Sequence, residues 1–207
     1  MKKLIFLETI QFHPSLTGGT APPDQKSRYP LKLINQVASA FYDANLLNIY
    51  NYVNQKKKQD FDVFDQYTKN YNVISQLDPD RGLYYFPLPA SLAAIPNYIA
   101  IRKLHQYKGE NYSQIDSTLA DSYKNLPLMD DDMFFLEGNK CYMPNDHEPK
   151  NFIVSLVVAF SAFSNQDEVT MPIGQRGTIL ELTINALINR IPQDKLDNTN
   201  PDESQRS

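Results

Sequence analysis

Apolar residues recur at every third or fourth position in two long stretches of the chain. The first stretch places such residues at Leu33, Ile34, Val37, Ala40, Phe41, Ala44 and Leu47. This spacing puts the apolar side chains on one face of an amphipathic helix. Because proline is tolerated in the first turn of a helix, the pattern predicts a long helix that begins at Pro30 and ends around residues 56–59.

The second stretch lies near the C-terminus. Its main apolar stripe consists of Leu180, Ile184, Leu187 and Ile191. A second set of apolar residues lies beside that stripe, at Ile179, Leu182 and Ile188. The pattern predicts a C-terminal helix from about Gly174 to Ile191, with an apolar surface wider than one narrow seam.

Between these helices the apolar pattern changes to short runs of strand length. The runs cover residues 61–67, 71–74, 81–89, 95–105, 133–143 and 152–160. They are rich in aromatic and β-branched residues, which are typical of strands. Within 133–143, Gly138 and Asn139 supply the positive φ angles of a tight hairpin turn. Turns rather than crossover helices separate the runs, so we expect a mainly antiparallel sheet of about five to seven strands.

The expected fold is therefore α+β: a long N-terminal helix, a mainly antiparallel sheet and a C-terminal helix. Residues 1–29 hold a short apolar start followed by a segment rich in glycine and proline, which favours an extended N-terminal arm. Residues 30–191 are expected to form a single α+β domain. Residues 192–207 are polar and contain proline, which is typical of a flexible C-terminal tail.

The charge balance argues against a dedicated nucleic-acid binder. The formal net charge is −4, from 20 basic and 24 acidic residues. Affinity for nucleic acid depends on lysine and arginine displacing counterions, and the one basic cluster, Lys56-Lys57-Lys58, has no aromatic residues among its lysines. That cluster is better explained as the solvated end of the first helix, where cations interact favourably with the helix dipole.

Targeting signals are weak in this chain. Glu8 interrupts the apolar run that follows Lys2 and Lys3, which leaves it too short for a signal peptide. No uninterrupted apolar stretch approaches the ~18 residues of a membrane helix. Cys141 is the only cysteine, so an intramolecular disulfide is excluded. We expect a soluble protein that is made in the cytoplasm and has no membrane partner.

Candidate chemistry is sparse. Asp130, Asp132 and His147 flank the predicted hairpin and could bind a divalent cation, but the same residues are typical of solvated acidic turns. Cys141 would act as a nucleophile only with a base brought from elsewhere, and a buried thiol is the alternative. We identify no catalytic or cofactor-binding residues and expect no cofactor and no enzymatic activity.

The order of the segments resembles a known family. The segments are Gly82–Pro89, Ile95–Ile101, the strand that ends near Phe163, the acidic turn Asp167–Pro172 and the terminal helix. After a long N-terminal helix, this order is similar to that of the head–tail connector (adaptor or portal-ring) proteins of tailed bacteriophages, particularly the ring proteins of crAss-like phages. The likeness covers about residues 27–195.

The resemblance implies a virion structural protein. Such proteins assemble as a homo-oligomeric ring, twelve-fold in the implied case, below the portal protein and next to other connector or tail proteins. The ring lines or supports the tunnel through which the genome is ejected. A mildly negative wall suits that role, because a surface that does not bind phosphate lets the duplex slide. Two alternatives remain open: a DNA-binding or DNA-end-handling phage protein, and an internal virion or cargo protein.

Two apolar segments are expected to contact other subunits. An extended arm cannot bury its own apolar side chains, and the wide apolar surface of the terminal helix can serve a neighbour or the portal. The candidate interface residues are Leu4, Phe6, Ile184, Leu187, Ile188 and Ile191. The alternative for the terminal helix is packing wholly within its own domain.

Overall fold

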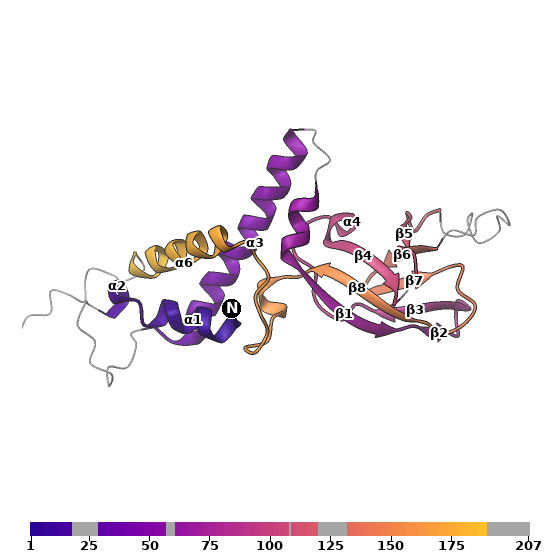
Figure 1. The fold of residues 1–207 in the computed structure, drawn as a ribbon, viewed down its shortest axis with the longest axis horizontal. Coiled ribbons are helices and arrows are strands. Elements are labelled where there is room, and N and C mark those ends of the chain that lie inside the picture. Colours follow the sequence, from indigo (N-terminus) through magenta and orange to yellow (C-terminus); the bar gives the residue numbers. More distant parts are fainter. Residues whose placement is uncertain (18–28, 57–60, 108, 120–131, 190–207) are drawn as a thin grey trace, which may run out of the picture. The chain divides into compact units, whose positions relative to one another are not determined.

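The computed structural model describes residues 1–17, 29–56, 61–107, 109–119 and 132–189. Figure 1 shows the order of the elements along the chain. The chain divides into two compact units, whereas the sequence predicted one domain over 30–191. The helical unit comprises Met1–Tyr42, Ser164–Val169 and Ile173–Ser207. The sheet unit comprises Asp43–Phe163 and Thr170–Pro172.

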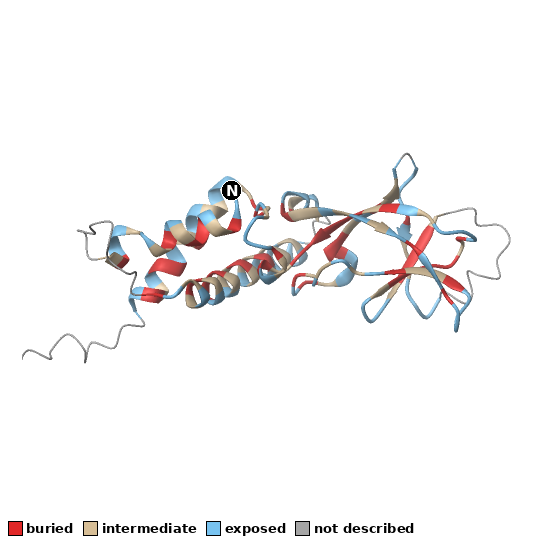
Figure 2. Ribbon diagram, turned by 90° about the horizontal axis from the view of Figure 1, so that it is seen from below, coloured by how far each residue is buried: buried red, intermediate tan, exposed pale blue. Residues whose placement is uncertain are grey.

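The helical unit is built from α1 (Lys3–Gln11), α2 (Pro14–Thr17), the first part of α3 (Leu31–Gln55) and α6 (Ile173–Ile188). Buried positions on its helices recur every three or four residues, as the colouring of Figure 2 shows. A hydrogen bond from the Tyr29 hydroxyl to the carbonyl of Leu187, 3.0 Å long, joins the residues before α3 to the last turn of α6. The buried apolar side chains of this unit include Phe6, Leu7, Ile10, Leu16, Ile34, Val37, Ile179, Ile184 and Leu187.

The N-terminal segment is a correction to the sequence prediction. Residues 3–17 of the expected extended arm form α1 and α2, and residues 18–28 lie outside the described residues. Backbone hydrogen bonds tie the start of the chain to residues 165–169, from the amide of Lys3 to the carbonyl of Asp167 (2.9 Å) and from the amide of Val169 to the carbonyl of Met1 (3.1 Å). The first apolar residues of the chain form the helix α1, and only one face of that helix is buried in the unit, at Lys3, Phe6, Leu7 and Ile10.

The sheet unit contains two sheets. The first has the order β1-β8-β4, where β1 is Thr68–Ile74, β8 is Asn151–Val157 and β4 is Ile101–Gln106; both pairings are antiparallel. The second has the order β2-β3-β7-β6-β5. In this order, β2 is Gln76–Asp78, β3 is Leu83–Pro87, β7 is Lys140–Met143, β6 is Met133–Glu137 and β5 is Ser113–Gln114. The pairing of β5 with β6 is parallel, and the other described pairings are antiparallel.

Aromatic side chains pack between the two sheets. The Phe152 ring of β8 lies 5.9 Å from that of Phe86 on β3 and meets the ring of Tyr112 edge-on at 5.2 Å. Leu104, Val154 and Leu156 complete this core with almost no exposure. Burial of such side chains stabilises the unit at about 25 cal/mol per Å² of apolar surface.

The α+β class and the mainly antiparallel pairing are confirmed, as are the long first helix and the C-terminal helix. Gly138 has a φ of 58° in the turn between β6 and β7, as the hairpin required. The prediction of a strand at 61–67 was wrong, because Phe61–Tyr67 forms the 3-10 helix η1, which buries Phe64 and Tyr67 three residues apart. Two short helices, α4 (Asn97–Ala100) and η2 (Phe160–Ala162), complete the unit, and α4 takes the first half of the strand predicted at 95–105.

Candidate functional site

Two of the three residues proposed for a cation site lie within the described structure. Asp130 lies outside the described residues, Asp132 is half-buried and His147 is exposed. Across the described part of the chain, no three histidine, cysteine, aspartate or glutamate side chains lie close enough to hold a metal ion. Cys141 is fully buried, and burial raises the pKa of its thiol well above the usual range, so it does not supply a thiolate.

A polar network lies one residue away from His147, at Asp146. The Oδ1 atom of Asp146 accepts hydrogen bonds from the Lys150 ammonium (2.7 Å) and from the Tyr112 hydroxyl (3.1 Å). Lys150 Nζ also donates to the Tyr112 oxygen at 3.3 Å, and Gln106 Nε2 donates to the same oxygen at 3.0 Å. Four side chains from three segments of the sheet unit therefore meet at one phenol oxygen and one carboxylate oxygen.

Neighbouring elements fix the members of this network. The backbone amide of Lys150 donates to Ser75 Oγ at 2.9 Å, and the amide of Ser75 donates to the carbonyl of Lys150 at 3.0 Å. The edge-on contact with Phe152 holds the Tyr112 ring. Gln106 is the last residue of β4, so its position follows from the pairing of β4 with β8. The network is thus anchored in the ends of strands.

The charges of the network are largely removed from water. The side chain of Asp146 is 2% exposed and that of Lys150 is 24% exposed. Burial lowers the pKa of Lys150, but the hydrogen bonds to Asp146 and Tyr112 outweigh burial, so its pKa lies above the ordinary value. Burial raises the pKa of Tyr112 to about 12. Within the described structure, the second oxygen of Asp146, Oδ2, is buried without a hydrogen-bond partner.

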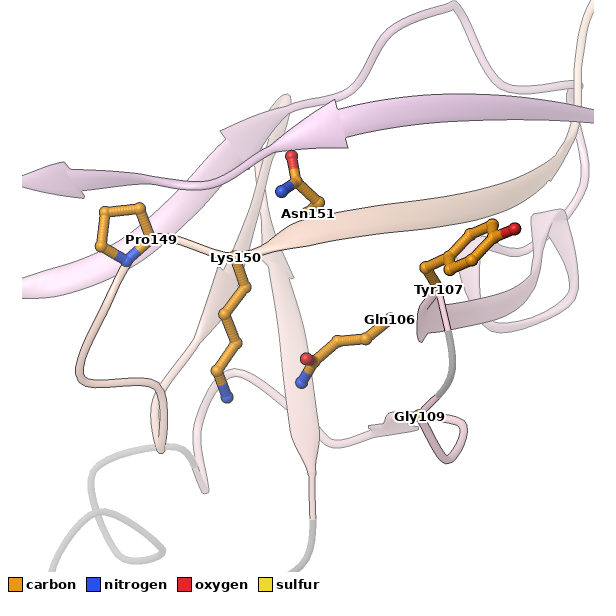
Figure 3. A pocket seen from close by; sticks show the side chains of 6 residues that line it. All are labelled: Gln106, Tyr107, Gly109, Pro149, Lys150 and Asn151. Carbon is orange, nitrogen blue, oxygen red and sulfur yellow. The ribbon is translucent and has the colours of Figure 1, made fainter.

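A pocket of about 510 Å³ opens beside the network. Figure 3 shows its lining residues, with the side chains of Lys150 and Gln106 on one side of the strand and that of Asn151 on the other. The volume falls within the range of small-ligand sites. Lys150 is the one cationic side chain among the lining residues, and its raised pKa keeps it protonated at neutral pH, where it is not a base. The arrangement suits binding through hydrogen bonds rather than proton transfer.

The candidate interface residues separate into core and surface. Phe6, Ile184 and Leu187 are buried inside the helical unit, so these residues are core and are not available to a partner. Leu4 is half-buried and Ile188 is 36% exposed, whereas Ile191 lies outside the described residues. For Phe6, Ile184 and Leu187 the prediction of an interface is therefore corrected, and for α6 the buried face fits the alternative of packing within its own unit.

A different set of apolar side chains faces solvent on the same helices. These side chains and their exposed fractions are Ile5 (50%) and Phe12 (60%) near or on α1, and Ile173 (83%), Leu182 (43%) and Ile188 on α6. Phe12 and Ile173 were missed by sequence reasoning, although each stands outside the buried spacing of its helix. That spacing is the signal that identifies them once the buried face is known.

No helix among the described residues is both long enough and apolar enough to cross a membrane. Comparison with protein-family models and with curated proteins finds no match for this chain.

Proposed function

We propose that this protein is a virion structural subunit that assembles into a ring of the head–tail connector of a tailed bacteriophage, below the portal protein. The observation that carries the proposal is the exposed apolar surface of the helical unit. Both α1 and α6 bury one face within the unit and still present large apolar side chains to solvent, up to 83% exposure at Ile173.

Exposed apolar side chains of this kind favour association with a partner. Exposed apolar residues gathered on helices with an already buried face mark sites of association rather than further core. A stable contact buries about 800 Å² on each partner, and such a contact would cover the exposed apolar side chains of α1 and α6. In a ring, the contact is heterologous, so α1 and α6 of one subunit meet a different surface of the next.

The order of segments supports the connector assignment. β3 falls within the segment Gly82–Pro89, whereas the segment Ile95–Ile101 holds α4 and leads into β4. β8 ends at Val157, before Phe163, and α6 follows the acidic turn. The formal net charge of −4 suits a tunnel wall that passes DNA without binding its phosphates.

The proposal is tested with the full-length chain by mass photometry and negative-stain microscopy, alone and with the portal protein of the same virion. We expect closed rings in at least one of these samples. Ile173→Asp should leave circular dichroism and the melting temperature unchanged, because the side chain is 83% exposed, and should abolish rings, because an unpaired carboxylate is costly to bury at a contact.

Leu77→Asp is the matched control, since Leu77 is 52% exposed and lies on β2 of the sheet unit, not on α1 or α6. It should assemble as the unaltered chain does. A wild-type protein that stays monomeric with and without portal would overturn the proposal, and so would an Ile173→Asp variant that still forms rings.

A further inference from the structure

The strand β1 leaves one row of backbone hydrogen-bonding groups open. Its groups at odd-numbered positions face β8, because the amide of Ser75, which continues the same register, donates to the carbonyl of Lys150 at 3.0 Å. Along an antiparallel strand, the hydrogen-bonding groups of successive residues point to opposite sides. The groups at even-numbered positions therefore point away from β8, at Thr68, Asn70, Asn72 and Ile74. Among the described residues, these outward backbone groups have no hydrogen-bond partner.

Among the described strands, β1 provides the longest open edge. It borders the β1-β8-β4 sheet, as Figure 1 shows. The outer side of β4 is already engaged, since the amide of Tyr112 donates to the carbonyl of Leu104 at 2.7 Å and His105 forms a β-bridge with Asn111. In the second sheet, the edge strands β2 and β5 have three and two residues, whereas β1 has seven.

The features that usually keep an exposed edge strand from pairing are missing from β1. Such features are proline, bulges and charged side chains along the edge. The register of β1 with β8 runs without interruption from Thr68 to Ile74, and the strand contains no proline. Its one charged side chain is Lys69, whose ammonium lies over the rings of Tyr71 and Phe163, 5.1 Å and 5.7 Å from their centroids. The edge can therefore accept another strand.

The chemistry of this edge selects a polypeptide strand as its occupant. Outward N–H and C=O groups that recur every second residue match the main chain of another extended strand. A second copy of this chain supplies such a strand in its own β1. Because the other described edges are short or engaged, the contact between two copies uses the same edge on both, which is an isologous contact with two-fold symmetry.

We propose that two copies of this chain associate edge to edge through β1, in the antiparallel register that places Tyr71 of both copies at the two-fold axis. In this register the outward groups of the even-numbered residues face one another. Asn70 faces Asn72 of the second copy, so two amide side chains meet on one face of the sheet. On the other face Lys69 meets Val73 of the second copy, so like charges are not opposed. The two β1-β8-β4 sheets then form one continuous sheet.

The β1 contact goes beyond the proposed ring and does not depend on it. β1 belongs to the sheet unit, whereas the ring contacts were assigned to α1 and α6 of the helical unit. A contact limited to one edge strand of seven residues is small beside a standard interface of about 800 Å² per partner. We therefore expect a reversible dimer that forms with rising protein concentration.

Sedimentation equilibrium of the full-length Ile173→Asp variant tests the β1 contact without the proposed ring contact. We expect exchange between monomer and dimer over about a hundredfold range of protein concentration. Adding Asn72→Pro should weaken dimerisation at least about tenfold, because proline removes one outward N–H group. The hydrogen bonds to β8 come from the odd-numbered positions, so circular dichroism should stay unchanged. Asn72→Ala keeps the N–H group and is the matched control, with dimerisation within about threefold of the parent.

Cysteine cross-linking of the otherwise unaltered full-length chain tests the register. Asn70→Cys and Asn72→Cys change exposed residues, and a mixture of the two variants should form an intermolecular disulfide faster than either variant alone. Cys141 is fully buried and is present in every sample. Asn48→Cys, at an exposed position of α3, is the control and should not cross-link above background.

Three results would overturn the proposal. They are a chain that stays monomeric at every concentration, equal dimerisation of the proline and alanine variants, and equal cross-linking of the mixture and the Asn48→Cys control. Ring assembly is measured separately, so either proposal can fail alone.

Discussion

At the scale of single residues, the pair Asp146–Lys150 joins a buried carboxylate to a largely buried ammonium. The Asp146 side chain is 2% exposed, an ammonium lies 2.7 Å from its Oδ1 atom, and a phenol donates to the same oxygen. Desolvation of both charges offsets much of their attraction, so such a pair adds little net stability over an apolar pair. Removing one partner is different, because it leaves the other charge buried and unpaired.

Lys150→Met should therefore lower the free energy of unfolding by about 3 kcal/mol in a urea titration at neutral pH. Adding Asp146→Asn to that variant should restore part of the loss, because the uncompensated carboxylate is then gone. Lys103→Met is the matched control. The Lys103 ammonium is 3.9 Å from Asp65 and 54% exposed, so the loss should stay below about 1 kcal/mol. Equal losses at the two lysines would contradict the buried-pair interpretation.

Tyr112 provides a second residue-scale prediction, in alkaline solution. Its pKa rises from the ordinary 10.0 to about 12 in the folded protein, mainly because of burial. The stability that goes with this shift is fully present below pH 10, where the phenol is neutral in both states. Above pH 10 the unfolded chain ionises first, so the free energy of unfolding falls as the pH rises towards 12.

Urea titrations of the unaltered chain and of Tyr112→Phe from pH 9 to pH 12 test this prediction. The free energy of unfolding of the unaltered chain, minus that of the variant, should fall above pH 10. The unaltered chain should lose stability more steeply than the variant. Subtraction removes the contribution of the other tyrosines. Parallel curves for the two proteins would show that Tyr112 titrates normally.

At the scale of elements, two glycines show how local conformation decides the effect of one methyl group. Gly138, in the β6–β7 turn, has a φ of 58°, which L side chains rarely adopt. Gly177 lies inside α6, and a Cβ atom added there would meet no atom within 4 Å.

Gly138→Ala should destabilise the protein by about 1–2 kcal/mol, because left-handed backbone crowds a Cβ atom against the following carbonyl. Gly177→Ala should stabilise it by about 0.5–1 kcal/mol, because alanine loses less backbone entropy in a helix interior. Urea midpoints of the two variants provide the comparison. A stabilising Gly138→Ala would mean that the hairpin turn does not hold the positive φ.

At the scale of the whole molecule, the division into a helical unit and a sheet unit predicts two regions with separate responses to mutation. Each unit has its own buried apolar core, and local opening follows such cores. Phe6 is 1% exposed in the helical unit, and its neighbour Ile5 is 50% exposed on the same helix.

Phe6→Ala should cost about 3–5 kcal/mol in the helical unit, because it opens a cavity in that core. Hydrogen exchange followed by mass spectrometry should then speed up in α1, α2 and α6 and stay unchanged in β1, β4 and β8. Ile5→Ala should leave exchange in both units near that of the unaltered chain. Faster exchange across both units in Phe6→Ala would show one cooperative domain instead.

The sequence by itself determined the elements whose pattern is local. The long helix α3, the hairpin at Gly138 and the strand β8 all follow from side-chain period, turn chemistry or a continuous apolar run. Each of these signals acts within one short stretch, so no partner is needed to recognise it. The α+β class and the antiparallel pairing follow from the order of those stretches.

The face that α6 buries was decided only by tertiary structure. The predicted stripe began at Leu180, but the buried face consists of Ile179, Thr183, Ile184 and Leu187. Thr183 was passed over because it is polar, yet its hydroxyl donates to the carbonyl of Ile179 at 2.7 Å, which satisfies it in the core. The helical N-terminus was missed for a related reason, since Phe6 has an apolar partner only once the helical unit has formed.

The candidate site depended even more on tertiary structure. Gln106, Tyr112, Asp146 and Lys150 belong to no motif, and Asp146 stood in the sequence only as a neighbour of His147. Their spacing along the chain carries no signal, because the pairing of β4 with β8 and the packing of Tyr112 on Phe152 bring them together. The periodicity of apolar residues along the sequence indicates which side chains are buried. It does not indicate which polar groups from distant segments will hydrogen-bond to the same buried oxygen.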